Sequence, residues 1–314
     1  MTEPNQTKGF PSIARRMHDP YVTDIPFTIC TMVTDPAEYA EMVASFVAAG
    51  FGPEDCEYLY CDNTGAGALD AFMAYNRFLE QARGRFVILC HQDVLLAFDR
   101  REKLEACLAD LDRRDQAWAL CGNAGGIEFG RHALCVTHSD GVPHCTQGLP
   151  IPVVSLDENF IVVKRSANLA VSHDLRGFHF YGTDLCRVAD FLGRTAWVID
   201  FHLLHKSTGR IDDSFHEALR SIIKKYRRTH RDGYIQTTCA VIPTGRSRWM
   251  IDRAMYARRH SLRKISDPSP SVSAEIKRIE KDLGPLKVVI QGVIYRLLSP
   301  VHNLRRSLRK RSQV

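Results

Sequence analysis

The amino-acid sequence predicts an α/β fold in which a mostly parallel sheet carries helices on both faces. Short apolar runs rich in β-forming residues alternate with amphipathic stretches of helical period. Helix-start and helix-stop residues separate the two kinds of segment. The chain has 314 residues, 45% hydrophobic and 25% charged, which is enough for a large core and argues against global disorder.

The first part of the chain supplies four strands and three helices in alternation. The predicted strands are residues 27–33, 57–61, 85–90 and 117–121, and the predicted helices are residues 36–49, 69–82 and 102–111. Asp35-Pro36 is a helix-start signal, and Gly50 and Gly52 end the first helix. Because successive strand–helix–strand units with right-handed crossovers build parallel sheets, this order predicts a parallel sheet.

The middle of the chain has a different pattern. Residues 128–145 contain the turn signal Ser139-Asp140-Gly141 between two short runs and predict a hairpin. Further along we expect strands at residues 153–155, 160–163 and 196–199 and helices at residues 185–192 and 213–226.

The charge is unevenly distributed. Residues 246–314 carry 17 Lys and Arg against 5 Asp and Glu, a net +12, while the remaining 25 basic and 31 acidic residues give −6. A Pro/Ser cluster at residues 267–271 predicts a linker, followed by helical pieces at residues 274–283 and 287–298. We therefore divide the chain into an N-terminal segment, a body and a basic extension: residues 1–26, 27–245 and 246–314.

Several classes of protein are not expected. The polar N-terminus lacks the pattern of a secretory signal, and no run approaches the roughly 20 apolar residues of a membrane span. Ten cysteines without such a signal are typical of reduced thiols, so we expect a cytoplasmic protein. A dinucleotide-binding site is also excluded. The first turn, Thr34-Asp35-Pro36, has no glycine, and after the second strand Asp70 occupies the third glycine position that would follow Gly65 and Gly67.

Polar residues follow the predicted strands where ligands bind in parallel sheets, beyond the carboxyl ends. They are Cys61-Asp62-Asn63 after the second strand, His91-Gln92-Asp93 after the third, and the glycine-rich run at residues 122–126 after the fourth. We expect these three segments to share one rim.

Three segments of the sequence, two of which include residues of this rim, resemble segments of one protein family. VILCHQDVLL resembles the strand-to-metal segment of GT-A glycosyltransferases, in the glycosyltransferase family 2-like branch with a His-Gln-Asp-Val motif. CDNTGAGALDAFMAYNRFLEQARGRFVIL resembles its aspartate turn, and FHFYGTDLCRVADFLGRTAWVIDFHLLHKSTG its catalytic carboxylate and late histidine. The resemblance covers about residues 27–215 and implies a GT-A, Rossmann-like sheet.

The resemblance also implies a divalent metal, Mn²⁺ or Mg²⁺. Asp93 corresponds to the second aspartate of the family's metal motif, and His91 stands where most of the superfamily has the first. His205 is the better match for the late histidine, ahead of His202. A divalent ion stabilises the charge of a leaving nucleoside diphosphate, and carboxylate oxygen suits such ions. Asp93 as the cap of the following turn remains the alternative.

The resemblance assigns the remaining roles. Asp62 and Asn63 would bind the nucleotide base together with Thr34; an Asx turn is the alternative for Asp62. Asp184 corresponds to the catalytic base of an inverting transfer, although a residue directly before a helix is also placed to be an N-cap. Thr183 replaces the glutamate that many relatives carry. Apart from the resemblance, their place on the loop before residues 160–163 makes Asp157 and Glu158 candidates for contacts with the donor sugar or the acceptor, and plain surface carboxylates are the alternative.

The predicted hairpin invites a zinc interpretation. It contains the residues His132, Cys135, His138, His144 and Cys145. Strand alternation places Cys135 on the face opposite His132 and His138, which opposes four converging ligands. We therefore expect a polar hairpin on the acceptor side.

We predict a glycosyltransferase that moves a sugar, most simply from a UDP-sugar, to a glycan, lipid-linked or small-molecule acceptor. One alternative is a nucleotide- or glycan-binding protein on the same fold without turnover. Another is an adaptor acting through its basic tail. We expect that tail to pack on the body, and contact with an anionic membrane surface is the second choice. Specific nucleic-acid binding is not expected.

Overall fold

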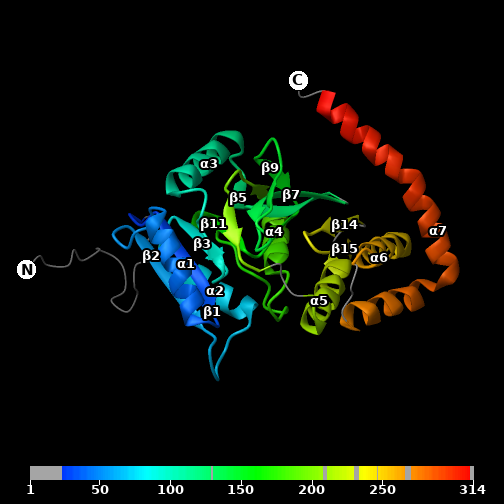
Figure 1. Cartoon of the computed structure of the whole chain (residues 1–314), viewed down its shortest axis with the longest axis horizontal. Coiled ribbons are helices and arrows are strands. Elements are labelled where there is room, and N and C mark those ends of the chain that lie inside the picture. The colour runs from blue at the N-terminus through cyan, green and yellow to red at the C-terminus, as the bar shows by residue number, and fades with distance from the viewer. Residues whose placement is uncertain are drawn as a thin grey trace, which may run out of the picture.

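A computed structural model describes residues 23–128, 130–207, 211–229, 233–245, 247–265 and 270–311 (Figure 1). Most of the predicted N-terminal segment, residues 1–26, therefore lies outside the described residues. So do residues 266–269, which form most of the predicted linker.

A seven-stranded sheet forms the centre of the molecule. Its order is β2 (Cys56–Asp62), β1 (Phe27–Val33), β3 (Phe86–Cys90), β11 (Phe160–Lys164), β5 (Trp118–Gly122), β12 (Thr195–Val198) and β9 (Ile151–Val153). The strands β2, β1, β3, β5 and β12 share one direction, and β11 and β9 run the opposite way. The predicted α/β fold with a mostly parallel sheet is confirmed.

The insertion of β11 between β3 and β5 did not follow from the order of elements. The four residues Phe160–Val163 are at most 1% exposed, so both faces of β11 are covered. A strand that is apolar on both faces needs neighbours on both sides. The central position of β11 satisfies this need, and its antiparallel direction follows from its register with β3.

Helices cover both faces of this sheet, as predicted. On one face α2 (Ala71–Gln81) and α4 (Tyr181–Phe191) pack through Tyr75 and Leu185 against Leu89 of β3. On the other, α1 (Pro36–Ala48) and α3 (Arg101–Arg114) form a core with Ile88. Alternate residues of each strand point to opposite faces, which explains why Ile88 and Leu89 join different cores.

Helices α1 and α2 begin at capping aspartates, whereas α3 and α4 begin without a side-chain cap. The Asp35 carboxylate accepts hydrogen bonds from the backbone N–H groups of Ala37 and Glu38 and begins α1, as the Asp35-Pro36 signal predicts. Helix α4 instead begins at Tyr181, after Phe180 at φ 69°, four residues before the predicted start. The alternative of Asp184 as an N-cap is therefore wrong, because it lies within the first turn.

A smaller sheet lies beside the first. Its order is β10 (Ser155–Leu156), β6 (Ala124–Glu128), β7 (Arg131–Thr137), β13 (Leu203–His205) and β4 (Val94–Leu95), with β8 (Pro143–Cys145) on the side of β7. The predicted hairpin at residues 128–145 is confirmed as β7 and β8. Residues 122–126, expected to be a rim loop, instead largely form the end of β5 and the start of β6.

The packing of β6 gives a testable consequence. A Cβ atom on Gly126 would lie 1.9 Å from the backbone oxygen of Gln236, the last residue of β14 (Gly233–Gln236). Because backbone must move to relieve this overlap, we expect Gly126→Ala to lower the free energy of unfolding by about 1–3 kcal/mol. Urea denaturation measures the effect. Gly65→Ala, where a Cβ meets nothing within 4 Å, is the control and should change little; equal losses in both variants would refute this packing.

The C-terminal part is mostly helical. Helix α5 (Asp213–Thr229), the β14–β15 hairpin (β15, Val241–Thr244) and α6 (Arg248–Leu262) pack together, and α7 (Pro270–Arg311) follows and passes around α6 (Figure 1). The two predicted helical pieces are confirmed as parts of α7, which breaks at Gly284 with φ 73°. Pro270 and Ser271, predicted to be linker, begin this helix. Residues 246–314 as a separate unit stay a prediction.

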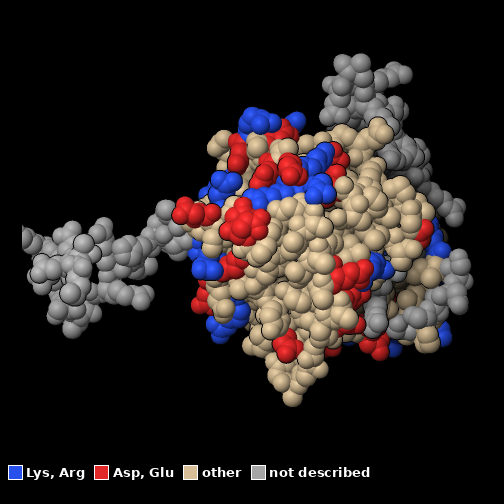
Figure 2. Space-filling view, turned by 60° about the vertical axis from the view of Figure 1, so that its left-hand side comes forward, with Lys and Arg blue, Asp and Glu red and all other residues tan. Residues whose placement is uncertain are grey.

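Two surface observations complete the description. Among the helices that the structure describes, none combines the length and apolar character needed to cross a bilayer. On the face shown in Figure 2, acidic and basic side chains lie intermixed along the border of a wide area without either.

Candidate active site

Three predicted metal ligands come together at the carboxyl end of β3. The turn after Cys90 carries His91 and Asp93 into β4, and β4 pairs with β13, which ends at His205. The Asp93 Oδ1 lies 3.4 Å from the His205 Nε2 and 3.9 Å from the His91 Nδ1. One ligand atom from each residue lies within 4.8 Å of the other two. The pairing of two strands distant in sequence therefore creates this cluster.

A hydrogen bond at Nε2, the ring nitrogen other than the one near Asp93, fixes the orientation of the His91 ring. Its Nε2 lies 3.0 Å from the Tyr181 hydroxyl, which donates a hydrogen bond of 3.2 Å to the Glu158 carbonyl. With the hydroxyl proton directed there, the Tyr181 oxygen accepts a hydrogen bond from the His91 Nε2–H. This leaves the Nδ1 lone pair toward Asp93. Burial, together with the neighbouring His205 ring, lowers the pKa of His91 to about 4, so the imidazole is neutral at pH 7.

The carboxylate of Asp93 is held in its charged form. Burial raises its pKa, but the hydrogen bond and charge of His205 lower it more, and the net shift is downward. His205 is buried, its Nε2 also lies 3.2 Å from the Ser207 Oγ, and its Nδ1 has no hydrogen-bond partner within the described structure. Two imidazole rings and a carboxylate whose ligand atoms lie this close together form a ligand set suited to a divalent metal.

Gln92 has a role that the sequence did not suggest. Its Oε1 accepts hydrogen bonds from the backbone N–H groups of Thr34 and Asp35, and its Nε2 donates to the Thr34 Oγ1 and to Glu38. The loop after β1 is thereby tied to the turn that carries the metal candidates. The sequence feature that could have pointed to Gln92 was its position between the two candidate metal ligands His91 and Asp93.

The residues predicted to bind the nucleotide lie at or next to the ends of two paired strands, β1 and β2. Val33 pairs with Asp62, so Thr34 and Asp62 lie at neighbouring ends of β1 and β2, both exposed. Asp62 Oδ1 accepts hydrogen bonds from the N–H and Oγ1 of Thr64, which is the Asx turn considered as the alternative. These bonds lower the pKa of Asp62. The side chain of Asn63 is committed to the backbone of Leu69 through both amide atoms.

Asp157 and Glu158 lie on the loop between β10 and β11, next to the site. Asp157 Oδ2 accepts a hydrogen bond of 2.6 Å from the Thr238 hydroxyl, a contact that the sequence did not suggest. Glu158 Oε1 accepts a hydrogen bond of 3.2 Å from the Gly182 N–H at the start of α4. Burial, with the neighbouring Asp157 carboxylate, raises the pKa of Glu158 to about 8. The backbone carbonyl of Glu158, not its carboxylate, is joined to His91 through the Tyr181 hydroxyl.

Asp184 is placed differently. It is 0% exposed, and its carboxylate accepts hydrogen bonds from the Ser172 N–H, the Ser172 hydroxyl and the Tyr226 hydroxyl at 2.6, 2.8 and 2.5 Å. Burial raises its pKa in spite of these bonds. An acceptor hydroxyl cannot reach this carboxylate without displacing its partners. The contacts of Asp184, predicted from the sequence as the base, are those of a structural group.

The remaining histidines and the hairpin cysteines do not join the cluster. Within the described ranges, His91, Asp93 and His205 are the group of potential metal ligands that lie close together. Cys135 and Cys145 are cross-strand partners with sulfur atoms 3.7 Å apart. The His202 Nε2 lies 2.8 Å from the Thr137 hydroxyl, so His202 faces away from the metal candidates.

The fold and this cluster together define an α/β protein with a candidate divalent-metal site at the carboxyl end of its third strand. The protein named ATP synthase subunits region ORF 6, from Fuscovulum blasticum, is 35% identical over 208 residues, covering 64% of this chain and 84% of that protein. The chain belongs to the same family as this protein. No family model matches the chain.

Solved structures were compared as well. The mannosyltransferase PcManGT from Pyrobaculum calidifontis, in complex with GDP-Man and Mn²⁺, aligns with a TM-score of 0.41 and 10% identity over 94% of this chain and 82% of its own. TarS of S. aureus aligns with a TM-score of 0.44 and 12% identity over 78% of this chain and 44% of its own. The chain thus spans less than half of TarS.

Proposed function

We propose that the protein is a metal-dependent glycosyltransferase that uses a nucleotide diphosphate sugar as donor. The observation that carries the proposal is the convergence of His91, Asp93 and His205 at the end of the strand whose sequence resembles the family's metal segment. A divalent ion held there supplies Lewis-acid stabilisation of the leaving diphosphate. Of Mn²⁺ and Mg²⁺ we propose Mn²⁺, because Mg²⁺ prefers oxygen ligands and two of the three ligands are imidazoles.

Other residues near the metal candidates would bind the nucleotide and the sugar of the donor. Thr34 and Asp62 lie at the ends of neighbouring strands, where a nucleoside reaches both, and a UDP-sugar is our first choice of donor. Gln92 fixes the distance between this part of the rim and the metal ligands. Asp157 lies on the loop beside His91, and we propose that it contacts the donor sugar. The proposed classes of acceptor are glycan, lipid-linked and small-molecule.

We propose Glu158 rather than Asp184 as the base that removes the acceptor proton in an inverting transfer. Glu158 is partly exposed, lies beside the Tyr181–His91 pair that its backbone carbonyl contacts, and has its pKa raised by burial to about 8. A base whose pKa lies near the working pH combines a sizeable ionised fraction with strong proton affinity. Asp184 instead joins α4 to Ser172 and Tyr226.

The two carboxylates are distinguished by paired variants. We expect Glu158→Gln to lower kcat/KM about 100-fold and to remove its rise as pH increases toward about 8, since the base acts deprotonated. The unfolding midpoint should stay unchanged, because the amide oxygen still accepts from the Gly182 N–H. Asp184→Asn should instead lower the free energy of unfolding by about 1–3 kcal/mol, because an NH₂ group would face the Ser172 donors. Loss of the pH profile in Asp184→Asn but not in Glu158→Gln would reverse the assignment.

The proposed activity is tested with the purified full chain, Mn²⁺ and a panel of UDP-, GDP- and dTDP-sugars. Slow donor hydrolysis without an acceptor is expected for one base, measured as release of the nucleoside diphosphate. Tight nucleotide binding with no release from any donor, even with candidate acceptors present, would favour the alternative of a binding protein on the same fold.

A second proposal concerns peripheral contact with a membrane. Leu286, Val289, Ile290 and Val293 of α7 are all exposed and lie at spacings that place them on one helical face. An apolar face on a helix of a strongly basic segment is typical of contact with an anionic membrane surface. Cytoplasmic location, at the inner membrane face, is part of this proposal.

A further inference from the structure

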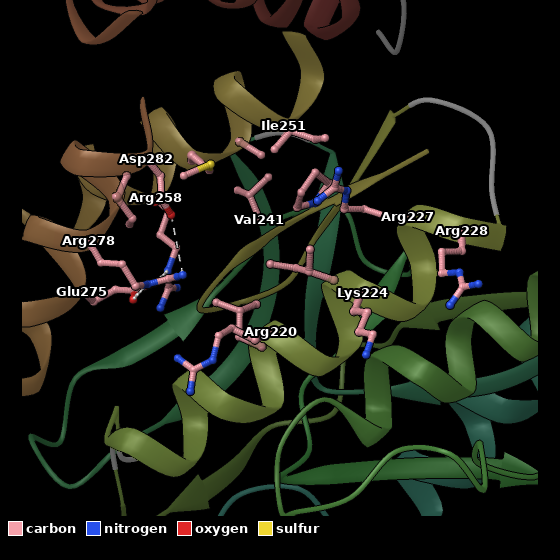
Figure 3. Close-up of a pocket in the computed structure, with 16 residues that line it drawn as sticks. Arg220, Lys224, Arg227, Arg228, Val241, Ile251, Arg258, Glu275, Arg278 and Asp282 are labelled. Atoms are coloured by element: carbon pink, nitrogen blue, oxygen red, sulfur yellow. Dashed lines mark hydrogen bonds and ion pairs between the residues drawn. The ribbon is translucent and has the colours of Figure 1, made fainter. Parts of the chain in front are cut away.

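A cavity of about 720 Å³ lies among α5, β15, α6 and α7, away from the metal candidates (Figure 3). Its volume is in the range of small-molecule sites. Much of its wall is apolar, and the side chains that form this part include Leu219, Ile223, Val241, Ile251, Met255 and Ile279. None of the residues proposed for glycosyl transfer lines it.

Basic side chains form the other part of the wall. Arg220, Lys224, Arg227 and Arg228 come from α5, at spacings that place them along one side of this helix. In the part of the chain that the structure describes, these four side chains make no ion pair. Arg220, Lys224 and Arg228 are exposed and Arg227 is half-buried, so water solvates these charges and an anion that enters the cavity can reach them.

Two further cations that line the cavity are balanced by an acidic side chain. Arg258 and Arg278 both contact the Glu275 carboxylate, at 3.3 and 2.8 Å (Figure 3). Glu275 is buried and saturated by these two partners. Among the described residues, Glu275 thus pairs with cations of α6 and α7, whereas no acidic side chain pairs with Arg220, Lys224, Arg227 or Arg228 of α5.

We propose that this cavity binds a phosphorylated lipid. The phosphate would lie against one or more of the four α5 cations that line the cavity, because guanidinium and ammonium groups bind phosphate through charge-assisted hydrogen bonds. The first part of the lipid chain would lie along the apolar wall, which a free phosphate would leave uncovered. This site goes beyond the proposed transferase reaction and does not depend on it.

The position of α7 supports a lipid as the source of the phosphate. Ile279 and Asp282 of α7 line the cavity, and the exposed apolar face that begins at Leu286 follows after the break at Gly284. A helix that rests on a bilayer through this face would bring the cavity close to lipid headgroups. Recognition of one headgroup would add to the weak attraction of the basic segment.

The experiment measures binding to the purified full chain by calorimetry with three probes. They are dodecyl phosphate below its micelle concentration, inorganic phosphate, and dodecyl maltoside as an uncharged amphiphile. We expect dodecyl phosphate to bind at least ten times more tightly than either of the others. Comparable binding of inorganic phosphate would show an anion site without a subsite for the lipid chain. Comparable binding of dodecyl maltoside would show an apolar pocket that does not recognise the headgroup. Either result would overturn the proposal.

A variant of α5 with three fewer positive charges tests whether dodecyl phosphate binds in this cavity. The triple variant Arg220→Gln/Lys224→Gln/Arg227→Gln keeps the helix propensity of α5, since Gln, Arg and Lys are similar in this respect. Its affinity for dodecyl phosphate should fall at least tenfold. The matched control, Lys103→Gln/Arg113→Gln/Arg114→Gln on α3, removes the same charge and should bind like wild type. No binding by wild type, or equal losses in both variants, would refute the site; circular dichroism verifies that both variants fold.

Discussion

Replacing Asp93 with asparagine is expected to lower Mn²⁺ affinity and donor turnover by about 100-fold or more. The Asp93 carboxylate faces both His205 and His91 and is the anionic member of the cluster. Asparagine keeps the size of the side chain but removes the charge that attracts a divalent ion. Loss of a preorganised group that stabilises developing charge typically costs a factor of 10²–10³ in kcat, and a lost ligand adds to this.

Mn²⁺ affinity is measured by electron paramagnetic resonance titration with UDP or another nucleoside diphosphate present. Asp190→Asn is the matched control, because Asp190 is an exposed aspartate on α4 that pairs with Arg187. It should titrate like wild type. Unchanged Mn²⁺ affinity in Asp93→Asn would remove Asp93 from the metal site, whatever the effect on folding.

Replacing Tyr181 with phenylalanine is expected to weaken Mn²⁺ binding by about 10- to 100-fold, although Tyr181 is not itself a ligand. Its hydroxyl fixes the His91 ring so that Nδ1 faces Asp93. Groups that orient a metal-binding histidine typically contribute this much to affinity. The loss of the buried hydrogen bond should also cost about 1 kcal/mol of stability.

A purely structural role of Tyr181 would lower stability without changing metal affinity. Tyr58→Phe serves as the comparison, because the Tyr58 hydroxyl donates a hydrogen bond of 2.6 Å to the Phe51 backbone carbonyl in another part of the molecule. It should lower stability by a similar amount and leave Mn²⁺ affinity as in wild type. If both variants behave alike in the titration, Tyr181 does not position His91.

Much of the fold was predictable because the sequence encodes it locally. Apolar runs such as Phe27–Val33 match strands, and Asp35-Pro36 begins a helix through backbone capping. The position of β11 was not predictable, because periodicity shows that a strand is buried on both faces but not between which neighbours. The early start of α4 was also missed, since Gly182 and Thr183 are weak helix formers whose burial in the folded chain overrides propensity.

The individual site residues were more predictable from the sequence than the contacts that bring them together in the fold. His91 and Asp93 are close in sequence, whereas His205 joins them through the pairing of β13 with β4. The roles of Gln92 and Tyr181 depend on hydrogen bonds between distant segments, which no local pattern reveals. The difference between Glu158 and Asp184 likewise appears only with burial, because both are carboxylates near the start of the same helix.

The central claim is that a divalent metal and a nucleoside diphosphate bind together at His91, Asp93 and His205. It is tested most directly by the unfolding midpoint of the wild-type chain with UDP, GDP, dTDP or CMP, each with and without Mn²⁺. Ligands that bind the folded state raise the midpoint by mass action. The proposal predicts a rise that needs both Mn²⁺ and one particular nucleotide and that disappears in Asp93→Asn. No rise with any combination, or a rise that persists in Asp93→Asn, would contradict it.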